Sequence, residues 1–136
     1  MRPYIVQEVA GPEDRRVFEP VVVRRVVSEE TSRMLVQMMN AVVDGRDDHR
    51  AQVPGYRVGG KTGTSTFVGR PDIIASFIGF VPVEDPQFIM LVKIDEPQDD
   101  RLGSVVAAPI FSELALPILA YLGVPPDDAA LVEGGP

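Results

Sequence analysis

The segment Gly59-Gly60-Lys61-Thr62-Gly63-Thr64 lies near the middle of the 136-residue chain and decides its fold. It fits two patterns that require different structures. With Gly55 it matches the phosphate-binding P-loop, Gly-x-x-x-x-Gly-Lys-Thr, which joins a buried strand to a helix. Lys61-Thr62-Gly63 alone matches a tripeptide that certain enzymes carry on a strand at the edge of the active-site cleft. The flanking residues decide between the two.

The flanking sequence argues against the P-loop and favours a strand. No buried strand precedes the first glycine, because a proline and the polar loop over residues 46–52 come before it. A glycine, several threonines and a phenylalanine follow Lys61, and β-branched and aromatic residues suit a strand better than a helix. We therefore expect residues 57–67 to form a strand that carries the motif.

The order of the expected strands and helices along the chain predicts an α+β fold, in which an antiparallel sheet is flanked by helices. The connections between the three central strands are short, and short connections imply antiparallel neighbours. The other expected elements are a strand over 4–9, an extended segment over 21–23, a helix over 28–44, strands over 73–81 and 88–95, and a helix over 105–122.

Two details of the helices are open to test. Ser28 should cap the first helix, whose apolar stripe and neighbouring methionines we expect in the core: Thr31, Met34, Leu35, Met38, Met39, Val42 and Val43. The last helix is apolar nearly all round and should be largely buried. Pro109 is tolerable in its first turn, whereas Pro117 should kink the helix or end it early.

Composition narrows the function. The net charge of −7 and the pI of about 4.6 argue against a nucleic-acid partner, which requires a basic surface. The chain has no cysteine, and His49 beside two aspartates has no second histidine, so we interpret its surroundings as a solvated loop and expect neither a metal nor a cofactor. No apolar run reaches the roughly 20 residues of a membrane span, and no export signal opens the chain.

Further motifs surround the central segment in a fixed order. They are Val53-Pro54-Gly55-Tyr56, Ile74-Ala75-Ser76-Phe77-Ile78-Gly79-Phe80-Val81-Pro82, Asp85-Pro86, Val92-x-Ile94-Asp95-Glu96-Pro97, Ala107-Ala108-Pro109-Ile110-Phe111 and Tyr121-Leu122-Gly123-Val124-Pro125-Pro126. Over about residues 20–126 the chain resembles the transpeptidase domain of class B penicillin-binding proteins. The resemblance implies part of the β-lactamase/transpeptidase-like fold, whose intact form has a five-stranded sheet and an all-helical lobe.

The resemblance also implies a reaction and site residues. The family attacks the D-Ala-D-Ala amide of a peptidoglycan stem peptide with a serine, forms an acyl-enzyme and transfers the acyl group to an amine; β-lactams acylate the same serine. It implies that Lys61 and Thr64 are catalytic. The Lys61 ammonium would assist the proton relay, and the Thr64 backbone N–H would be a donor in the oxyanion hole. It further implies that Lys61, Thr62, Gly63 and Thr64 bind substrate, the threonine hydroxyls holding its terminal carboxylate.

Two family motifs are absent. None of the six serines has a lysine three residues later, and no serine lies two residues before Asn40, the only asparagine. Ser-x-x-Lys and Ser-x-Asn are therefore missing. We expect residues 1–126 to be the C-terminal portion of a transpeptidase domain, inactive alone, with residues 127–136 as a flexible tail.

The expected setting follows from the resemblance. The parent protein should be anchored in the cell membrane with this domain outside the cytoplasm, beside the missing N-terminal part of the domain and the machinery of cell-wall synthesis. Surfaces that face the missing part should be apolar patches or promote self-association. The alternatives are a P-loop nucleotide-binding protein and a non-catalytic interaction module.

Overall fold

The computed structural model describes residues 1–45, 49–66, 69, 72–98 and 101–127. Predictions about the loop over 46–48, the end of the motif strand at residue 67, the turn at 70–71, the charged loop at 99–100 and the tail over 128–136 lie outside the described residues. The chain forms two compact units, Met1–Ser32 and Arg33–Pro136. The predicted boundary between a domain and a tail at residue 126 stays a prediction.

The first unit contains a small hairpin. Strand β1 (Glu8–Ala10) pairs antiparallel with β2 (Arg15–Val17), and the Arg15 guanidinium donates two hydrogen bonds, of 2.7 and 2.9 Å, to the Glu8 carboxylate across it. The strand predicted over 4–9 is therefore shorter and later than expected. Residues 21–23 form no strand, because no neighbouring strand pairs with them in the described unit.

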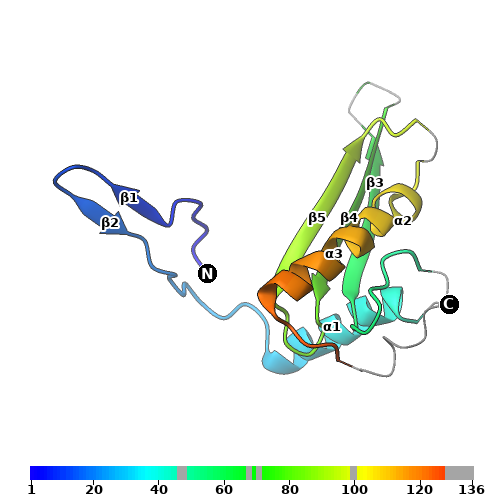
Figure 1. Cartoon of the computed structure of the whole chain (residues 1–136), viewed down its shortest axis with the longest axis horizontal. Helices are drawn as coiled ribbons and strands as arrows, with labels where there is room; N and C mark the ends of the chain where they lie inside the picture. Colours follow the sequence, from blue (N-terminus) through cyan, green and yellow to red (C-terminus); the bar gives the residue numbers. More distant parts are fainter. Residues whose placement is uncertain (46–48, 67–68, 70–71, 99–100, 128–136) are drawn as a thin grey trace. The chain divides into compact units, whose positions relative to one another are not determined.

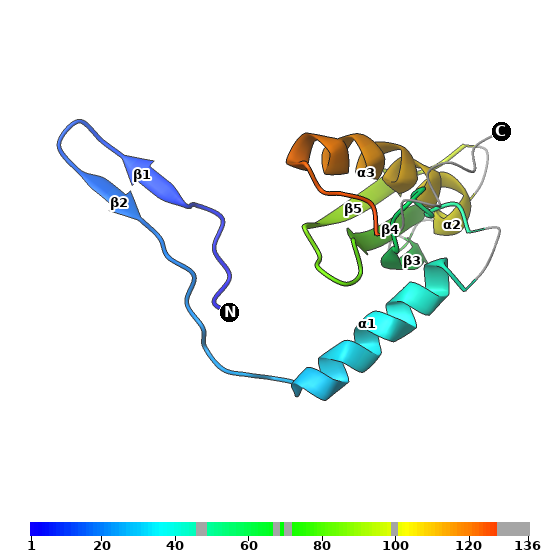
Figure 2. The same ribbon diagram turned by 60° about the horizontal axis from the view of Figure 1, so that its bottom comes forward.

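Helix α1 (Glu29–Val43) begins as predicted and packs differently. Ser28 Oγ accepts a hydrogen bond of 3.0 Å from the Thr31 N–H, which confirms the N-cap. Figure 2 shows that α1 approaches the sheet with its C-terminal end alone. The prediction of a buried methionine stripe is consequently wrong, since Met34 and Met38 are exposed. Asn40, a polar residue outside the predicted apolar stripe, is buried.

A three-stranded antiparallel sheet forms the centre of the second unit (Figure 1). Its strands are β3 (Gly59–Thr66), β4 (Ile73–Val81) and β5 (Phe88–Asp95), in the spatial order β3-β4-β5. The bounds of β4 and β5 and the central place of β4 are confirmed. Strand β3 begins two residues later than predicted, because Arg57 and Val58 bond to other parts of the chain, as described below.

Helices α2 (Gly103–Val106) and α3 (Ala108–Leu122) cover one face of the sheet (Figure 1). The single helix predicted over 105–122 is divided in two, and because α3 begins at Ala108, Pro109 lies in its first turn, where it is tolerable. Gly123 ends α3 with a φ of 68°. Pro117 does not end the helix early, since α3 continues through it to Leu122. The edge-to-face contact between Phe77 and Phe111, with ring centroids 5.1 Å apart, joins β4 to α3 in the core.

The prediction that α3 is largely buried is wrong. Only one stripe is buried against the sheet, formed by Ala108, Phe111, Ala115 and Leu119. Large apolar side chains on the other side are exposed: Ile110, Leu114, Leu116, Tyr121 and Leu122. An apolar helix covered on one side fits the expectation of exposed apolar patches, whereas self-association stays a prediction.

The prediction that no apolar run is long enough to span a membrane needs a correction at Gly103–Leu122. An 18-residue window of this 20-residue segment has a mean hydropathy of 1.9, so by length and composition alone the segment is long and apolar enough to cross a membrane. Ser104, Ser112 and Glu113 interrupt the run, so its residues are not all apolar, but the apolar residues around them keep the average high. The buried stripe of α3 contacts β4 and β5, as a core helix does, and a single segment of this kind is weak evidence for a membrane span.

Candidate functional site

The motif lies on β3, an edge strand of the described sheet. Lys61 and Thr64 are exposed, while Thr62 and Gly63 are partly buried. Thr62 pairs with Phe77 and Thr64 with Ala75, and both partners are buried beneath the helices. Because directly paired residues point to the same side of a sheet, both threonine side chains lie on the helix-covered side, at its open edge. Lys61 points to the other side.

The motif glycines have a packing role. A Cβ atom on Gly59 would lie 2.3 Å from the Phe80 ring, and one on Gly60 would lie 2.4 Å from the Phe77 ring. The two phenylalanines therefore cover the glycines from opposite faces of the sheet. Moreover, β3 runs through the lysine and threonine where a P-loop would begin a helix. The P-loop interpretation is thus excluded by the local structure.

The Lys61 ammonium lies along the strand. Its Nζ donates to the Thr62 carbonyl at 3.0 Å and to Thr62 Oγ1 at 3.4 Å. Among the described residues, no carboxylate forms a salt bridge with it. The motif therefore presents a cation and two hydroxyl groups at one sheet edge, which is a combination suited to binding a carboxylate.

A hollow of about 480 Å³ opens beside Thr62. Its lining comes from the end of α1, the following loop, β3 and α2: Ala41, Val42, His49, Arg50, Thr62, Ser104 and Val105. His49 is partly buried, its ring lies 5.9 Å from that of Phe77, and its Nδ1 accepts a hydrogen bond of 3.2 Å from the Ala51 N–H. His49 in the predicted solvated loop is thus only partly exposed and packs on the core, and nothing in the polar flanking sequence signals this contact.

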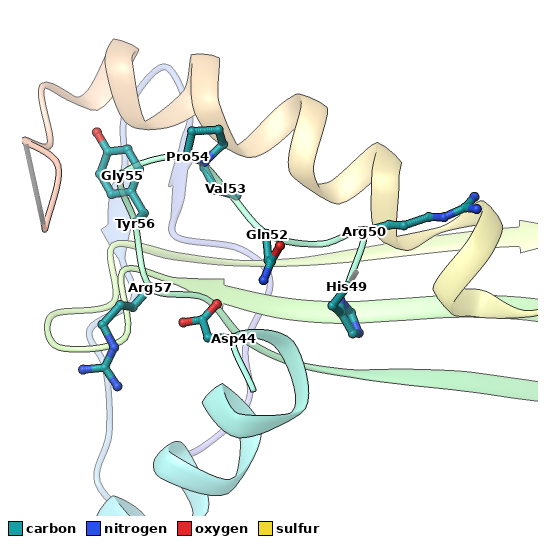
Figure 3. Close-up of a pocket in the computed structure, with 9 residues that line it drawn as sticks. All are labelled: Asp44, His49, Arg50, Gln52, Val53, Pro54, Gly55, Tyr56 and Arg57. Atoms are coloured by element: carbon teal, nitrogen blue, oxygen red, sulfur yellow. The ribbon is translucent and has the colours of Figure 1, made fainter. Parts of the chain in front are cut away.

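A second hollow, of about 670 Å³, lies between the residue that follows α1 and the segment that leads into β3 (Figure 3). It is lined by Asp44, His49, Arg50, Gln52, Val53, Pro54, Gly55, Tyr56 and Arg57. In Figure 3 the Asp44 carboxylate stands at the end of α1, between Arg57 and Gln52. Sequence reasoning assigned no role to Asp44 or Arg57, because their bonds join segments that are distant in sequence.

Those bonds converge on the two residues before β3. Asn40 Nδ2 donates to the Val58 carbonyl at 3.0 Å and to the Asp44 carboxylate. Arg57 Nη2 donates to Asn40 Oδ1 at 2.6 Å, and the Arg57 N–H donates to Asp127 Oδ2 at 2.8 Å. The entry to the motif strand is thus held by the end of α1 and by the segment after α3.

Comparison with known proteins gives a consistent result. The family described as "Penicillin binding protein transpeptidase domain" matches residues 1–116. Stage V sporulation protein D of Bacillus subtilis is 38% identical over 133 residues, which are 91% of this chain and 21% of that protein. Peptidoglycan D,D-transpeptidase FtsI of Escherichia coli is 35% identical over 120 residues, or 82% of this chain and 20% of that protein. The chain spans about a fifth of these relatives.

Solved structures share the fold. The apo transpeptidase domain of Burkholderia pseudomallei penicillin-binding protein 3 is 38% identical, with a TM-score of 0.66 over 77% of this chain and 34% of that chain. A peptidoglycan synthetase from Bifidobacterium adolescentis, 20% identical, has a TM-score of 0.75 over 90% of this chain and 24% of that chain. The α+β fold is therefore confirmed.

Proposed function

We propose that this chain, which belongs to the penicillin-binding protein transpeptidase domain family, forms the substrate-binding wall of a peptidoglycan D,D-transpeptidase. The observation that carries the proposal is the placement of Lys61, Thr62 and Thr64 together on an edge strand. An edge strand leaves backbone groups free to pair with an extended peptide. A stem peptide that lies along β3 would bring its carboxylate to the hydroxyls and to the ammonium.

The chemistry proposed for the complete protein is acyl transfer. The oxygen of a serine outside this chain bonds to the carbonyl carbon of the D-Ala-D-Ala amide, and the terminal D-Ala leaves as an amine after taking a proton. An amine of a second stem peptide then takes the acyl group and frees the serine. Thr64 supplies a backbone N–H to the oxyanion, and Lys61 supplies positive charge and assists proton transfer.

The isolated chain should form no acyl-enzyme. It contains neither Ser-x-x-Lys nor Ser-x-Asn, so no serine in it has the lysine partner that the family mechanism requires. Incubation with a fluorescent penicillin followed by denaturing electrophoresis should give no labelled band at 14.8 kDa. A covalently labelled band at that mass would show that this part of the proposal is wrong.

The site assignment is tested in a longer protein that contains this chain and is labelled by the penicillin. Thr62→Val with Thr64→Val removes both hydroxyls and keeps the shape of the β-branched side chains. Loss of hydrogen bonds to a charged group should slow labelling by about 10- to 100-fold. Thr66→Val, at the exposed end of β3, is the matched control and should leave the rate unchanged. Equal rates in all variants would overturn the assignment.

The setting proposed for the parent protein is the outer side of the cell membrane, where it is anchored and acts with the machinery of cell-wall synthesis.

A non-catalytic interaction module is the second candidate. It is favoured by the exposed apolar side chains of Ile78, Ile89 and Leu91, on the sheet face opposite the helices. If the chain were such a module, it would bind a partner, and the rate of penicillin labelling would not change in Thr62→Val with Thr64→Val.

A further inference from the structure

We infer that Asn40, near the C-terminal end of α1, is a positioning residue for the motif strand; its significance for substrate rests on the function proposed above. The side chain is buried, with 7% of its surface exposed. It uses both ends of its amide, since Nδ2 donates to the Val58 carbonyl at 3.0 Å and Oδ1 accepts from Arg57 Nη2 at 2.6 Å. One side chain thus bonds to both residues that precede β3.

Asp44 completes the attachment from the same helix end. Its Oδ2 accepts from the Val58 N–H at 3.3 Å and also from Asn40 Nδ2. The backbone N–H and C=O of Val58 are therefore both bonded to side chains at the end of α1. Val58 is fully buried, so losing either partner leaves a buried polar group without its hydrogen bond. The position of the chain as it enters β3 is consequently tied to α1.

Arg57 is held from other directions as well. Its guanidinium also pairs with Glu84, in the turn between β4 and β5, and its N–H donates to Asp127 at 2.8 Å. Asp127 in turn donates its own N–H to the Gly55 carbonyl at 2.9 Å. These bonds fix residue 57 to the sheet and to the segment after α3, whereas Asn40 supplies the attachment to α1.

The attachment bears on the motif in two ways. At about 3.3 Å per residue along a strand, Thr62 lies only about 13 Å from Val58, on the same continuous segment of chain. Independently, the residues next to Asn40 in sequence, Ala41 and Val42, line the hollow beside Thr62. Asn40 therefore positions both the start of the strand and the wall of the hollow that faces its threonine.

A positioning role differs from general stabilisation in where the effect appears. Removal of the Asn40 amide should loosen β3 and leave β5 unchanged, because β5 lies at the far side of the sheet. Leu119→Ala provides the matched control, since this fully buried side chain on α3 is apolar and makes no hydrogen bond, and its loss lowers stability as a whole. The two variants then give different patterns of local opening.

The test is amide hydrogen exchange, followed by NMR on the 136-residue chain. For Asn40→Ala, amides of residues 59–66 should exchange about tenfold faster relative to those of residues 88–95, the typical effect of one buried amide losing its partner. Leu119→Ala should accelerate both strands by a similar factor. If Asn40→Ala does not fold, Asn40→Ser, which keeps a small polar group, replaces it in the same exchange measurement.

A nearly isosteric variant tests the bonds themselves. Asn40→Asp keeps an acceptor for Arg57, whereas its carboxylate cannot donate to the Val58 carbonyl and faces the Asp44 carboxylate. Amides of β3 should therefore exchange faster relative to those of β5 in Asn40→Asp as well. Equal acceleration of both strands in Asn40→Ala, or exchange of β3 at the wild-type rate in either variant, would overturn the inference. Because exchange needs no ligand, failure of the wild-type chain to bind a β-lactam would count against the proposed function alone.

Discussion

Gly60→Ala tests whether the motif glycines are required by packing. The added Cβ would lie 2.4 Å from Cζ of Phe77 and 2.9 Å from the Ile78 carbonyl oxygen, both well inside ordinary contact distance. The ring has little room to move, because Phe77 is fully buried and packs edge-to-face on Phe111. Overpacking of this kind typically costs about 1–3 kcal/mol, whereas replacing a strand glycine by alanine alone gains about 0.5–1 kcal/mol. We expect a net loss of about 1–2 kcal/mol.

Urea unfolding of the chain measures this difference, with Gly63→Ala as the matched control. A Cβ on Gly63 would meet only the Ser76 hydroxyl, at 2.7 Å, and that side chain is able to rotate away. Gly63→Ala should therefore leave stability within about 0.5 kcal/mol of wild type. In addition, Phe77→Leu combined with Gly60→Ala should show a favourable coupling energy in a double-mutant cycle. If Gly60→Ala is as stable as wild type, the packing argument is refuted.

Three further outcomes are expected. Leu119→Ala should lower the free energy of unfolding by about 2–5 kcal/mol, because this side chain is fully buried. Leu114→Ala should lower it by under about 1 kcal/mol, because this side chain is 47% exposed. Similar losses for the two variants in urea unfolding would contradict the burial of a single stripe on α3. Ser28→Ala should cost about 1 kcal/mol by removing the N-cap of α1, and circular dichroism during urea unfolding would detect it; an unchanged midpoint would argue against the cap. Ile89→Ser with Leu91→Ser should shift the chain towards monomer in sedimentation velocity, because both side chains are exposed on the uncovered sheet face; an unchanged distribution of species would exclude that face as the contact.

The sheet was the part of the fold most open to sequence prediction. The strands over 73–81 and 88–95 are bounded by turn residues and rich in β-branched and aromatic side chains, and the structure confirms both. Gly123 likewise marks the end of α3, because a left-handed φ favours glycine. These features depend on local sequence, which is why they were predictable.

Burial was harder to predict, because it depends on what lies opposite each side chain. The stripe of α1 that includes Met34 and Met38 has the right periodicity for a core face and yet is exposed in this chain. Asn40 lies outside the predicted apolar stripe, but its bonds to Arg57 and Val58 place it inside. Both errors have one cause: contacts between distant segments leave no periodic signal in the sequence.

The candidate site was predictable as a motif and less so as an environment. Lys61, Thr62 and Thr64 lie on a strand, as the flanking sequence predicted. The edge position of that strand, the hollow beside Thr62 and the packing of His49 on Phe77 were not foreseen. The expected roles of these motif residues stay proposals. Binding of a carboxylate by the threonines is testable in the chain itself, whereas the catalytic roles of Lys61 and Thr64 require the longer protein that contains the serine.

The most direct test of the central claim is an NMR titration of the chain with benzylpenicillin at millimolar concentration. If β3 is the substrate-binding edge, the amide signals of Thr62 and Thr64 should shift in a saturable manner, and Thr62→Val with Thr64→Val should abolish the shifts without changing the dispersion of the spectrum. An absence of shifts on β3, or saturable shifts confined to another surface, would contradict the claim that this strand binds the carboxylate of substrate.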